Sequence, residues 1–336
     1  MRDNNIIFHS DSDKEINEWR DSHGNTKLHI ASWEGNLEEV KFLIPKVDIT
    51  IKNNNGNTAL HFAASIPNNS QVIAELAKAG GIDIKSNAGF AALHYAAGTG
   101  QTGNVKALLE FGADFNIRDK DGRTAIHIAA KEGKTEAVEA LLTKGVSPEL
   151  VDGTQDKYTA LHLAAAYGHH NVVAKLIEFG ADFNATDNRG LTALHMATYC
   201  EKPDVVATLL ESGANVNLQN LYLGDTALHI AVKKGNIQVI TALKNAVANV
   251  DIKNKKGETA LDVANKIEDE SNRDTITGLL SGASRIKIEG LLNPGTDPER
   301  RFKIESGKEG SLNKKPRLAP EDRVSQLVKA GAKSLG

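Results

Sequence analysis

One four-residue pattern recurs along this 336-residue chain at a nearly constant interval. The pattern is Thr-Ala-Leu-His or a close copy, and its eight copies begin at Thr26, Thr58, Ala91, Thr124, Thr159, Thr192, Thr226 and Thr259. We call these four residues the signature and number the repeats 1 to 8 in its order. Successive copies are separated by 32 to 35 residues. Because self-similarity at a fixed period near 33 residues is typical of stacked small units, the sequence predicts a repeat protein rather than one large globular core.

Each signature predicts the start of a short helix, and a second helix follows it. In the first repeat, Leu28 and Ala31 share one helical face, and Val40 and Leu43 share a face of the next helix. A Thr at the helix start can cap free backbone N–H groups, and Gly35 lies where the first helix must stop. One helix pair is too small to bury the apolar faces of both its helices. Each repeat must therefore be covered by its neighbours.

Residues 112–142 hold the best copy of the whole unit. A Gly-rich turn comes first, then Thr124-Ala-Ile-His127, a glycine turn at Gly133 and the Leu-rich stretch 137–142. This arrangement resembles the ankyrin repeat over roughly residues 20–283, with Ala where that family usually has Pro. The resemblance implies a mainly all-α fold, namely an ankyrin-repeat solenoid of helix-turn-helix units with short β-hairpin fingers and a curved concave face.

Composition divides the chain into three parts. We expect residues 1–18 to be a disordered or capping N-terminus, residues 19–283 the solenoid of about eight repeats, and residues 284–336 a basic, largely disordered tail. The tail contains 12 Lys+Arg and 7 Asp+Glu, a net charge of +5, whereas the rest of the chain carries −8. The last repeat has Asp262 in place of the signature His, as expected of a polar capping unit.

The tail also holds two basic clusters. Arg300 and Arg301 are followed after 12 residues by Lys314, Lys315, Pro316 and Arg317. This spacing matches a bipartite nuclear-import signal, in which an extended chain lies along an acidic groove of an import carrier. A chance match in a Lys-rich tail is the equal alternative.

Three patterns invite an enzymatic reading, and we favour a structural one for each. Residues 98–103 match the dinucleotide fingerprint Gly-x-Gly-x-x-Gly, but they follow a predicted helix instead of a strand. Seven of the eleven His are signature residues, and repeats about 10 Å apart cannot share one ion; the resemblance implies that they bond backbone groups of a neighbouring turn. His169-His170 and Cys200 lack partners with a metal-binding or nucleophile pattern. We therefore expect no catalytic residues, no metal and no cofactor.

The resemblance places the variable residues at the finger tips and at the exposed ends of the first helices. Four of the five tyrosines fall there, in repeats 5 to 7, together with two lengthened fingers. Tyr is enriched at interface hot spots because it buries area and still offers a hydroxyl. The predicted partner-binding residues are Trp33, Phe90, Arg118, Arg123, Tyr158, Tyr167, Arg189, Leu191, Tyr199, Leu221, Tyr222, Leu223 and Lys233. Packing between fingers is the alternative for these aromatic and apolar residues.

These observations predict a non-catalytic protein–protein interaction module. The basic ends of the binding set favour an acidic peptide or protein as partner, and ordinary solubilising charge is the alternative. We expect a monomer without a nucleic-acid partner. With no secretory signal and no apolar stretch of about 18 residues, we expect an intracellular protein, cytoplasmic and, if the tail signal is used, nuclear. The alternative function is a secreted bacterial effector or inhibitor of a eukaryotic host pathway; an enzyme with an unrecognised site ranks last.

Overall fold

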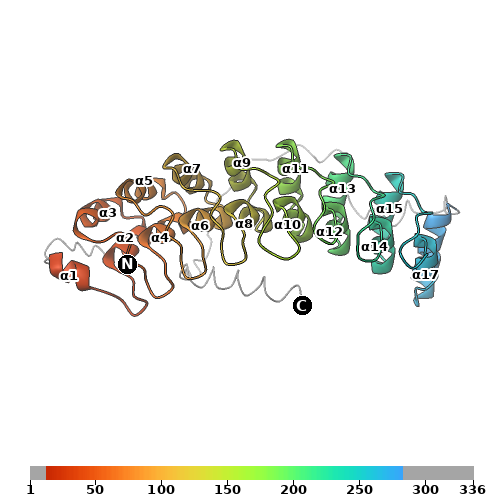
Figure 1. Ribbon diagram of the computed structural model, residues 1–336, viewed down its shortest axis with the longest axis horizontal. Coiled ribbons are helices and arrows are strands. Elements are labelled where there is room, and N and C mark those ends of the chain that lie inside the picture. The colour runs from red at the N-terminus through yellow and green to blue at the C-terminus, as the bar shows by residue number, and fades with distance from the viewer. Residues whose placement is uncertain (1–12, 283–336) are drawn as a thin grey trace, which may run out of the picture. The chain divides into compact units, whose positions relative to one another are not determined.

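The computed structural model describes residues 13–282, which form pairs of antiparallel helices stacked in two rows (Figure 1). The chain divides after Leu280 into two compact units, and only the first lies essentially within the described residues. The first helices of the repeats are α2 (Lys27–Glu34), α4 (Ala59–Ser65), α6 (Ala92–Thr99), α8 (Ala125–Lys131), α10 (Ala160–Tyr167), α12 (Ala193–Tyr199), α14 (Ala227–Lys234) and α16 (Ala260–Ala264). The second helices are α3 (Leu37–Leu43), α5 (Ser70–Ala79), α7 (Thr102–Glu110), α9 (Thr135–Thr143), α11 (His170–Glu178), α13 (Pro203–Glu211), α15 (Ile237–Asn245) and α17 (Glu270–Ser281).

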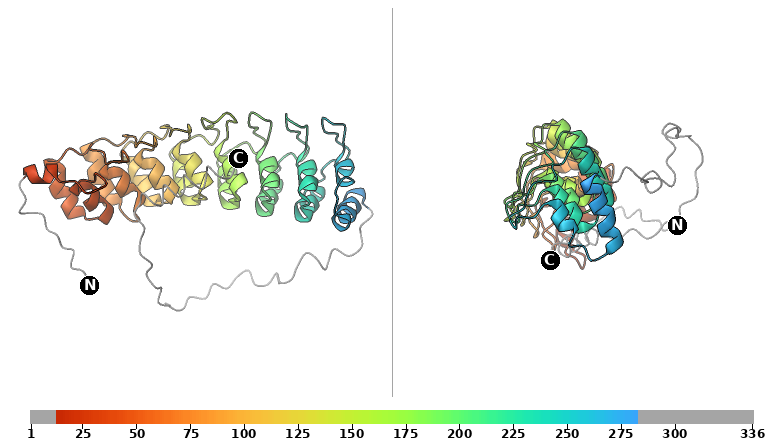
Figure 2. Two further views of the ribbon diagram at one scale, coloured as in Figure 1. Left: turned by 90° about the horizontal axis from the view of Figure 1, so that it is seen from below. Right: turned by 90° about the vertical axis from the view of Figure 1, so that its right-hand side faces the viewer.

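Each helix packs against its partner in the same repeat and against the equivalent helices of the adjacent repeats. Thus α8 contacts α6 and α10 in one row, and α7 contacts α5 and α9 in the other. Figure 2 shows the connecting loops, here called fingers, projecting together from one side of the helices. Finger n precedes the signature of repeat n, so fingers 5, 6 and 7 are residues 151–158, 186–191 and 219–225. The predicted mainly helical solenoid is confirmed.

The core runs between the two rows and is continuous from one repeat to the next. The signature Leu side chains are buried, with Leu161, Leu194 and Leu228 each 1% exposed. The small Ala164 and Ala165 are fully buried, which lets neighbouring helices approach closely. This burial confirms the register predicted for the repeats.

The signature also fixes where each first helix begins. In repeat 5, the Thr159 hydroxyl accepts from the backbone N–H of His162 at 3.4 Å, and His162 Nδ1 accepts from the Thr159 N–H at 3.3 Å. This is a reciprocal capping box with His in the place of the usual Glu or Gln. Ala91 has no hydroxyl, so repeat 3 keeps only the bond from its N–H to His94 Nδ1. Gly168 ends α10 with a left-handed φ of 85°, as predicted for this turn.

Both ends of the described stack are atypical. Residues Asp13–Glu18 form helix α1, whose Ile16 is fully buried, so this part of the N-terminal segment is ordered and covers the first repeat. A short 3-10 helix, Ile44–Lys46, follows α3 and contacts α1. In the last repeat, Asp262 Oδ2 accepts from the Thr259 N–H and hydroxyl, both at 2.8 Å, and thereby replaces the signature His in the cap.

The fingers differ from the β-hairpins that the resemblance implies. Within residues 13–282 only two isolated antiparallel bridges occur, Val151 with Thr159 and Thr186 with Thr192. Successive fingers are instead linked by backbone bonds, such as Asn188 N–H to Asp156 O at 2.8 Å and Leu221 N–H to Arg189 O at 2.8 Å. Each finger is therefore a turn closed by a few backbone bonds of its own, such as Asp119 N–H to Arg123 O at 2.9 Å, and it is also bonded to the adjacent fingers.

A buried Asp or Asn near the base of most fingers organises the turn, a role that the sequence analysis did not identify. Asp119 Oδ1 accepts from the N–H groups of Asp121 and Arg123 at 2.9 and 2.8 Å. Asn53 makes the same two bonds in finger 2, to Asn55 and Asn57. Aspartate and asparagine favour such bonds to their own following backbone. The signal was present in the sequence as a second series of polar residues with the repeat period.

Candidate protein-binding surface

Six of the seven signature histidines bond to the next repeat and are not available as ligands. Because the Nδ1 atom of each ring accepts a backbone N–H, the proton must lie on Nε2. His29 Nε2 donates to Asn57 O, and His61 Nε2 donates to Phe90 O, both at 2.9 Å. Burial lowers the pKa of His61 to about 4, so the ring is neutral at pH 7. Among the described residues, no group of three or more His, Cys, Asp or Glu could hold a metal ion.

The two lengthened fingers change this series of bonds. At finger 5 the acceptor for His127 Nε2 is Leu150 O, 23 residues onward at 2.9 Å, whereas the other bonded signature rings reach 28 or 29 residues onward. At finger 7 the ring of His195 is 2% exposed, and the backbone of Asp225 and of Leu218 lies near it, but neither carbonyl reaches hydrogen-bonding geometry with Nε2. The inserted residues thus remove one inter-repeat bond and leave a buried N–H without a partner.

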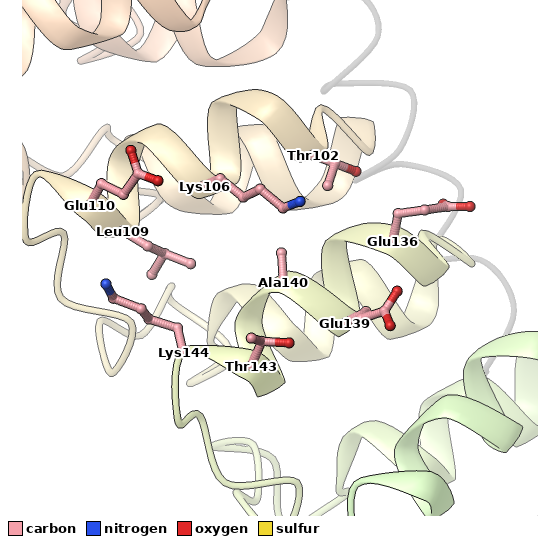
Figure 3. A pocket seen from close by; sticks show the side chains of 9 residues that line it. All are labelled: Thr102, Lys106, Leu109, Glu110, Glu136, Glu139, Ala140, Thr143 and Lys144. Carbon is pink, nitrogen blue, oxygen red and sulfur yellow. The ribbon is translucent and has the colours of Figure 1, made fainter.

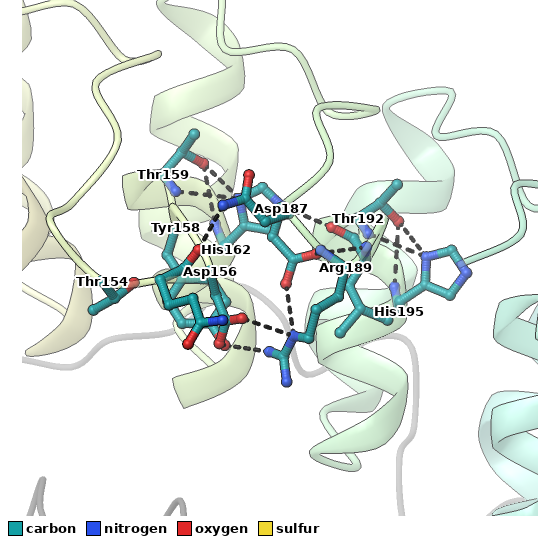
Figure 4. Close-up of polar contacts among 12 residues, drawn as sticks. Thr154, Asp156, Tyr158, Thr159, His162, Asp187, Arg189, Thr192 and His195 are labelled. Atoms are coloured by element: carbon teal, nitrogen blue, oxygen red, sulfur yellow. Dashed lines mark hydrogen bonds and ion pairs between the residues drawn. The ribbon is translucent and has the colours of Figure 1, made fainter. Parts of the chain in front are cut away.

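A polar network joins fingers 5 and 6 (Figure 4). The Tyr158 hydroxyl donates to Asp156 Oδ2 at 2.9 Å and accepts from Arg189, while Arg189 also pairs with Asp156 and Asp187 at 3.3 and 3.4 Å. Tyr158 is only 6% exposed, and burial raises the pKa of its hydroxyl. The repeat pattern predicts Tyr158 on the binding surface, and the structure corrects this: Tyr158 is a core residue that joins two fingers.

Phe90 requires the same correction. It is 8% exposed and packs edge-on against Tyr95, at 5.6 Å between ring centroids, and against His94 at 5.7 Å. Leu191 and Trp33 are half-buried, and Leu191 packs against the core. The repeat pattern places these residues on the correct side of the stack but does not show how far each side chain turns inward.

Several of the predicted cations are engaged inside the protein. Arg123 pairs with Asp119 and Asp121 at 2.9 and 2.5 Å. Arg118 is exposed, but its guanidinium donates to the carbonyls of Gly122 and Val151, in fingers 4 and 5. Lys233 is exposed and pairs with Asp225 at 2.5 Å. With Arg189, these residues hold fingers in place, which leaves less free positive charge at the fingers than the sequence indicates.

Four of the predicted aromatic and apolar residues are exposed to solvent, and a fifth is half-buried. Tyr222 and Leu221 at the tip of finger 7 are 79% and 64% exposed, and Leu223 beside them is 38% exposed. Tyr199, at the end of α12, is 60% exposed, and Tyr167, at the end of α10, is half-buried. Exposed apolar side chains on one loop are costly in water unless a partner covers them. These residues form the candidate surface, and their role in binding stays a prediction.

The motifs with an enzymatic reading lie in structural positions. Residues 98–103 span the turn from α6 to α7, with no strand before them. His169 Nε2 donates to Lys131 O at 2.8 Å, and the pKa of the half-buried Cys200 thiol is raised by burial, which disfavours a reactive thiolate.

A shallow groove between α7 and α9 gathers charges of both signs (Figure 3). Leu109 and Ala140 line it together with Lys106, Glu110 and Glu136. The mixed charge of its lining offers no single chemistry.

Comparison with known families settles the fold family. Three matches to a family model described as ankyrin repeats (3 copies) cover residues 5–88, 69–152 and 148–220, and a second ankyrin-repeat model matches residues 201–244. The chain belongs to the ankyrin-repeat family. Among solved structures, the ankyrin-repeat domain of Bcl-3, a member of the IkappaB protein family, has a TM-score of 0.58 and 31% identity, covering 66% of this chain and 99% of that one. The ankyrin-repeat domain of human ASB11 has a TM-score of 0.54 and 25% identity, covering 76% and 98%.

Curated relatives share only ankyrin repeats with this chain. Ankyrin repeat and SOCS box protein 3 of Bos taurus is 50% identical over 111 residues, 33% of this chain and 21% of that protein. Palmitoyltransferase ZDHHC17 of Homo sapiens is 57% identical over 49 residues, 15% of this chain and 8% of the enzyme. The chain therefore spans about a fifth or less of these relatives, and a match of about one and a half repeats transfers no acyl-transfer activity. In the part of the chain that the structure describes, no helix is both long and apolar enough to cross a bilayer.

Proposed function

We propose that this protein is a non-catalytic interaction module that binds a partner protein through the first helices and fingers of repeats 5 to 7. The observation that carries the proposal is the exposure of Tyr199 and of finger 7, at positions that the repeat leaves free to vary. Ankyrin repeats are typically protein-binding scaffolds, and aromatic side chains at the centre of an interface supply most of its affinity. The fold fixes the shape of this surface and does not name its target.

A direct test uses the full-length protein as bait in an affinity purification, followed by binding measurements on the partner recovered. Tyr199→Ala or Tyr222→Ala should weaken binding at least roughly tenfold without lowering the melting temperature, because both rings are exposed. Tyr95→Ala is the contrasting variant: its half-buried ring bonds Asn57 at 2.8 Å, so it should lower stability. A partner that binds both exposed-tyrosine variants as well as the parent would locate the interface elsewhere.

The proposal extends to localisation through the tail. Arg300, Arg301, Lys314, Lys315 and Arg317 lie outside the described residues, and the spacing of the two clusters is what supports nuclear import. If the protein acts as an effector within a eukaryotic host, the captured partner will be a host protein. A purification from the host lysate, run beside one from the source organism, separates that alternative.

A further inference from the structure

We infer that the partner segment bound along the first helices of repeats 4 to 7 is an acidic peptide. The inference rests on the proposed function and adds the chemistry of the partner. It is carried by a row of side chains at the last turns of four consecutive helices, α8, α10, α12 and α14, each of which packs on the next.

The row alternates lysine and tyrosine in a defined order. Lys131 ends α8, and its Nζ lies 5.2 Å from the centre of the Tyr167 ring at the end of α10. Tyr199 ends α12, and Lys234, at the end of α14, places Nζ 4.2 Å from the centre of its ring. Two exposed or half-buried rings thus lie between two cations, and the ring contacts hold each ammonium close to the surface of its tyrosine.

A third cation lies inside the same row. Lys202 packs its stem beside Gly168, where an added Cβ would come within 2.9 Å of Lys202 Cδ, and Gly168 directly follows Tyr167. The charges of Lys202 and Lys234 both lower the pKa of the Cys200 thiol, and Cys200 directly follows Tyr199 in the sequence. Lys202 therefore lies beside the residues that directly follow the two tyrosines of the row.

The charges of these three lysines are not neutralised by ion pairs with described carboxylates. No described carboxylate lies within ion-pairing distance of Lys131, Lys202 or Lys234. By contrast, Lys175 pairs with Glu139 and Glu178 at 3.2 and 2.8 Å, and Arg123 and Arg189 in the fingers pair with aspartates. The three lysines of the row therefore differ from those cations of the repeats whose charge is neutralised by an ion pair.

Two carboxylates adjoin the row and limit its net charge. Glu132 follows Lys131 in the sequence, and Glu201 precedes Lys202. The charge of Glu201 raises the pKa of the Cys200 thiol, whereas the charge of Lys202 lowers it. Neither glutamate forms an ion pair within the described residues. The row keeps an excess of one positive charge over these two, and Lys131 and Lys234 each contact a tyrosine ring.

The positive charge of the row indicates which kind of molecule can bind to it. The chain's own C-terminal tail has a net charge of +5, so the lysines would repel it. A nucleic acid would require many phosphate contacts along a continuous basic track, and here three lysines are interspersed with Glu132 and Glu201. A peptide with two or three carboxylates around an apolar or aromatic side chain matches the row, because it can pair with the lysines while covering the rings.

The experiment is a selection of random 12-residue peptides displayed on phage, with the full-length protein as the immobilised target. Selected peptides should be enriched in Asp and Glu around an apolar residue. Fluorescence anisotropy with the most enriched synthetic peptide should show binding that weakens with rising salt, since exposed ion pairs are screened. Changing Lys131, Lys202 and Lys234 together to Glu should reduce its affinity at least roughly tenfold. The matched control is Lys106→Glu on the exposed side of α7, which should leave the affinity unchanged.

Several outcomes would overturn the inference. One is a selection whose peptides have no acidic bias; another is an acidic peptide that binds the triple variant and the parent equally. Tighter binding of a 20-nucleotide single strand than of the peptide would favour nucleic acid as the occupant. Neutral peptides that lose affinity with Tyr199→Ala would reject the acidic chemistry but support the proposed function. The absence of any selected binder sensitive to Tyr167, Tyr199 or Tyr222 would reject both.

Discussion

His162 Nε2 donates a hydrogen bond to Leu191 O at 3.0 Å, from the first helix of repeat 5 to the finger of repeat 6. The same ring accepts the Thr159 N–H through Nδ1, so one imidazole both starts its own helix and holds the next repeat. In repeat 6, His195 keeps the first bond, from Thr192 N–H at 3.1 Å, and lacks the second. The protein therefore contains its own comparison between a signature His with the inter-repeat bond and one without it.

Changing His162 to Gln should cost more stability than changing His195 to Gln. A Gln at this helix position can still reach the N-cap backbone as in the usual capping box, so the bond specific to His162 is the one to Leu191. Its loss should make the free energy of unfolding about 1 kcal/mol lower for His162→Gln than for His195→Gln. Urea unfolding of the two variants and the parent measures this difference. Equal losses in the two variants would mean that the bond to Leu191 contributes nothing measurable.

Stability should fall as the pH is lowered from 6.5 towards 4. Burial lowers the pKa of His61 and of His127 to about 4, against 6.5 for an ordinary His. Above pH 6.5 both rings are neutral in the folded and the unfolded chain, so they contribute no pH dependence. Between pH 6.5 and 4 the unfolded chain binds the protons and the folded chain does not, which costs up to about 3 kcal/mol per ring.

Urea unfolding at pH 7, 6 and 5 measures this slope. The double variant His61→Gln with His127→Gln should lose part of the slope while remaining folded at pH 7. A parent protein whose stability is flat between pH 7 and 5 would contradict the assignment of these rings as buried and neutral.

Leu161→Ala should lower the free energy of unfolding by about 2–5 kcal/mol, because the side chain is 1% exposed between repeats and its removal leaves a cavity. The matched control is Leu221→Ala at the exposed tip of finger 7, which should stay within about 0.5 kcal/mol of the parent. Thermal or urea unfolding measures both. A loss below about 0.5 kcal/mol for Leu161→Ala would be incompatible with the register of the stack.

Residues 295–322, fused to a fluorescent cargo too large to diffuse through nuclear pores, should drive nuclear accumulation in a eukaryotic cell. The two basic clusters of this segment would pair with acidic grooves of an import carrier. Replacing Lys314, Lys315 and Arg317 with Ala should abolish accumulation, as seen by fluorescence microscopy. The matched control replaces Lys329 and Lys333, which lie outside both clusters. Cytoplasmic retention of the intact fusion would refute the import signal.

The sequence was sufficient to predict the repeat stack, because the stack depends on periodic local features. The signature Leu, the Thr cap and the glycine turn each act within one repeat or at its immediate boundary, so their spacing alone predicts them. The buried Asp119 and its equivalents in other fingers obey the same period and could have been found in the same way. The absence of regular hairpin strands from residues 13–282 could not have been found in this way, because each finger closes with only a few backbone bonds of its own and also bonds to its neighbours.

The candidate surface was only partly predictable, for a physical reason. Whether a finger residue points outward depends on its rotamer and on the adjacent finger, and neither is periodic. Tyr158 and Tyr222 illustrate this: the first turns inward to meet Arg189 and is 6% exposed, and the second stands 79% exposed on a lengthened finger. The ring contacts of Lys131 and Lys234 likewise join residues of different repeats and require the packed structure.

The missing bond at His195 also has a mechanical meaning. Repeats pulled apart along the stack carry the same tension, as links of a chain do, so rupture begins at the link with the fewest cross-links. Between repeats 6 and 7 the series of histidine bonds is interrupted, so this link lacks a cross-link that the other links have. Tyr199 and Lys234 stand on opposite sides of it. A ligand that binds both residues would bridge this link, and occupancy of the surface would then be readable as an increase in the force needed to separate the two repeats.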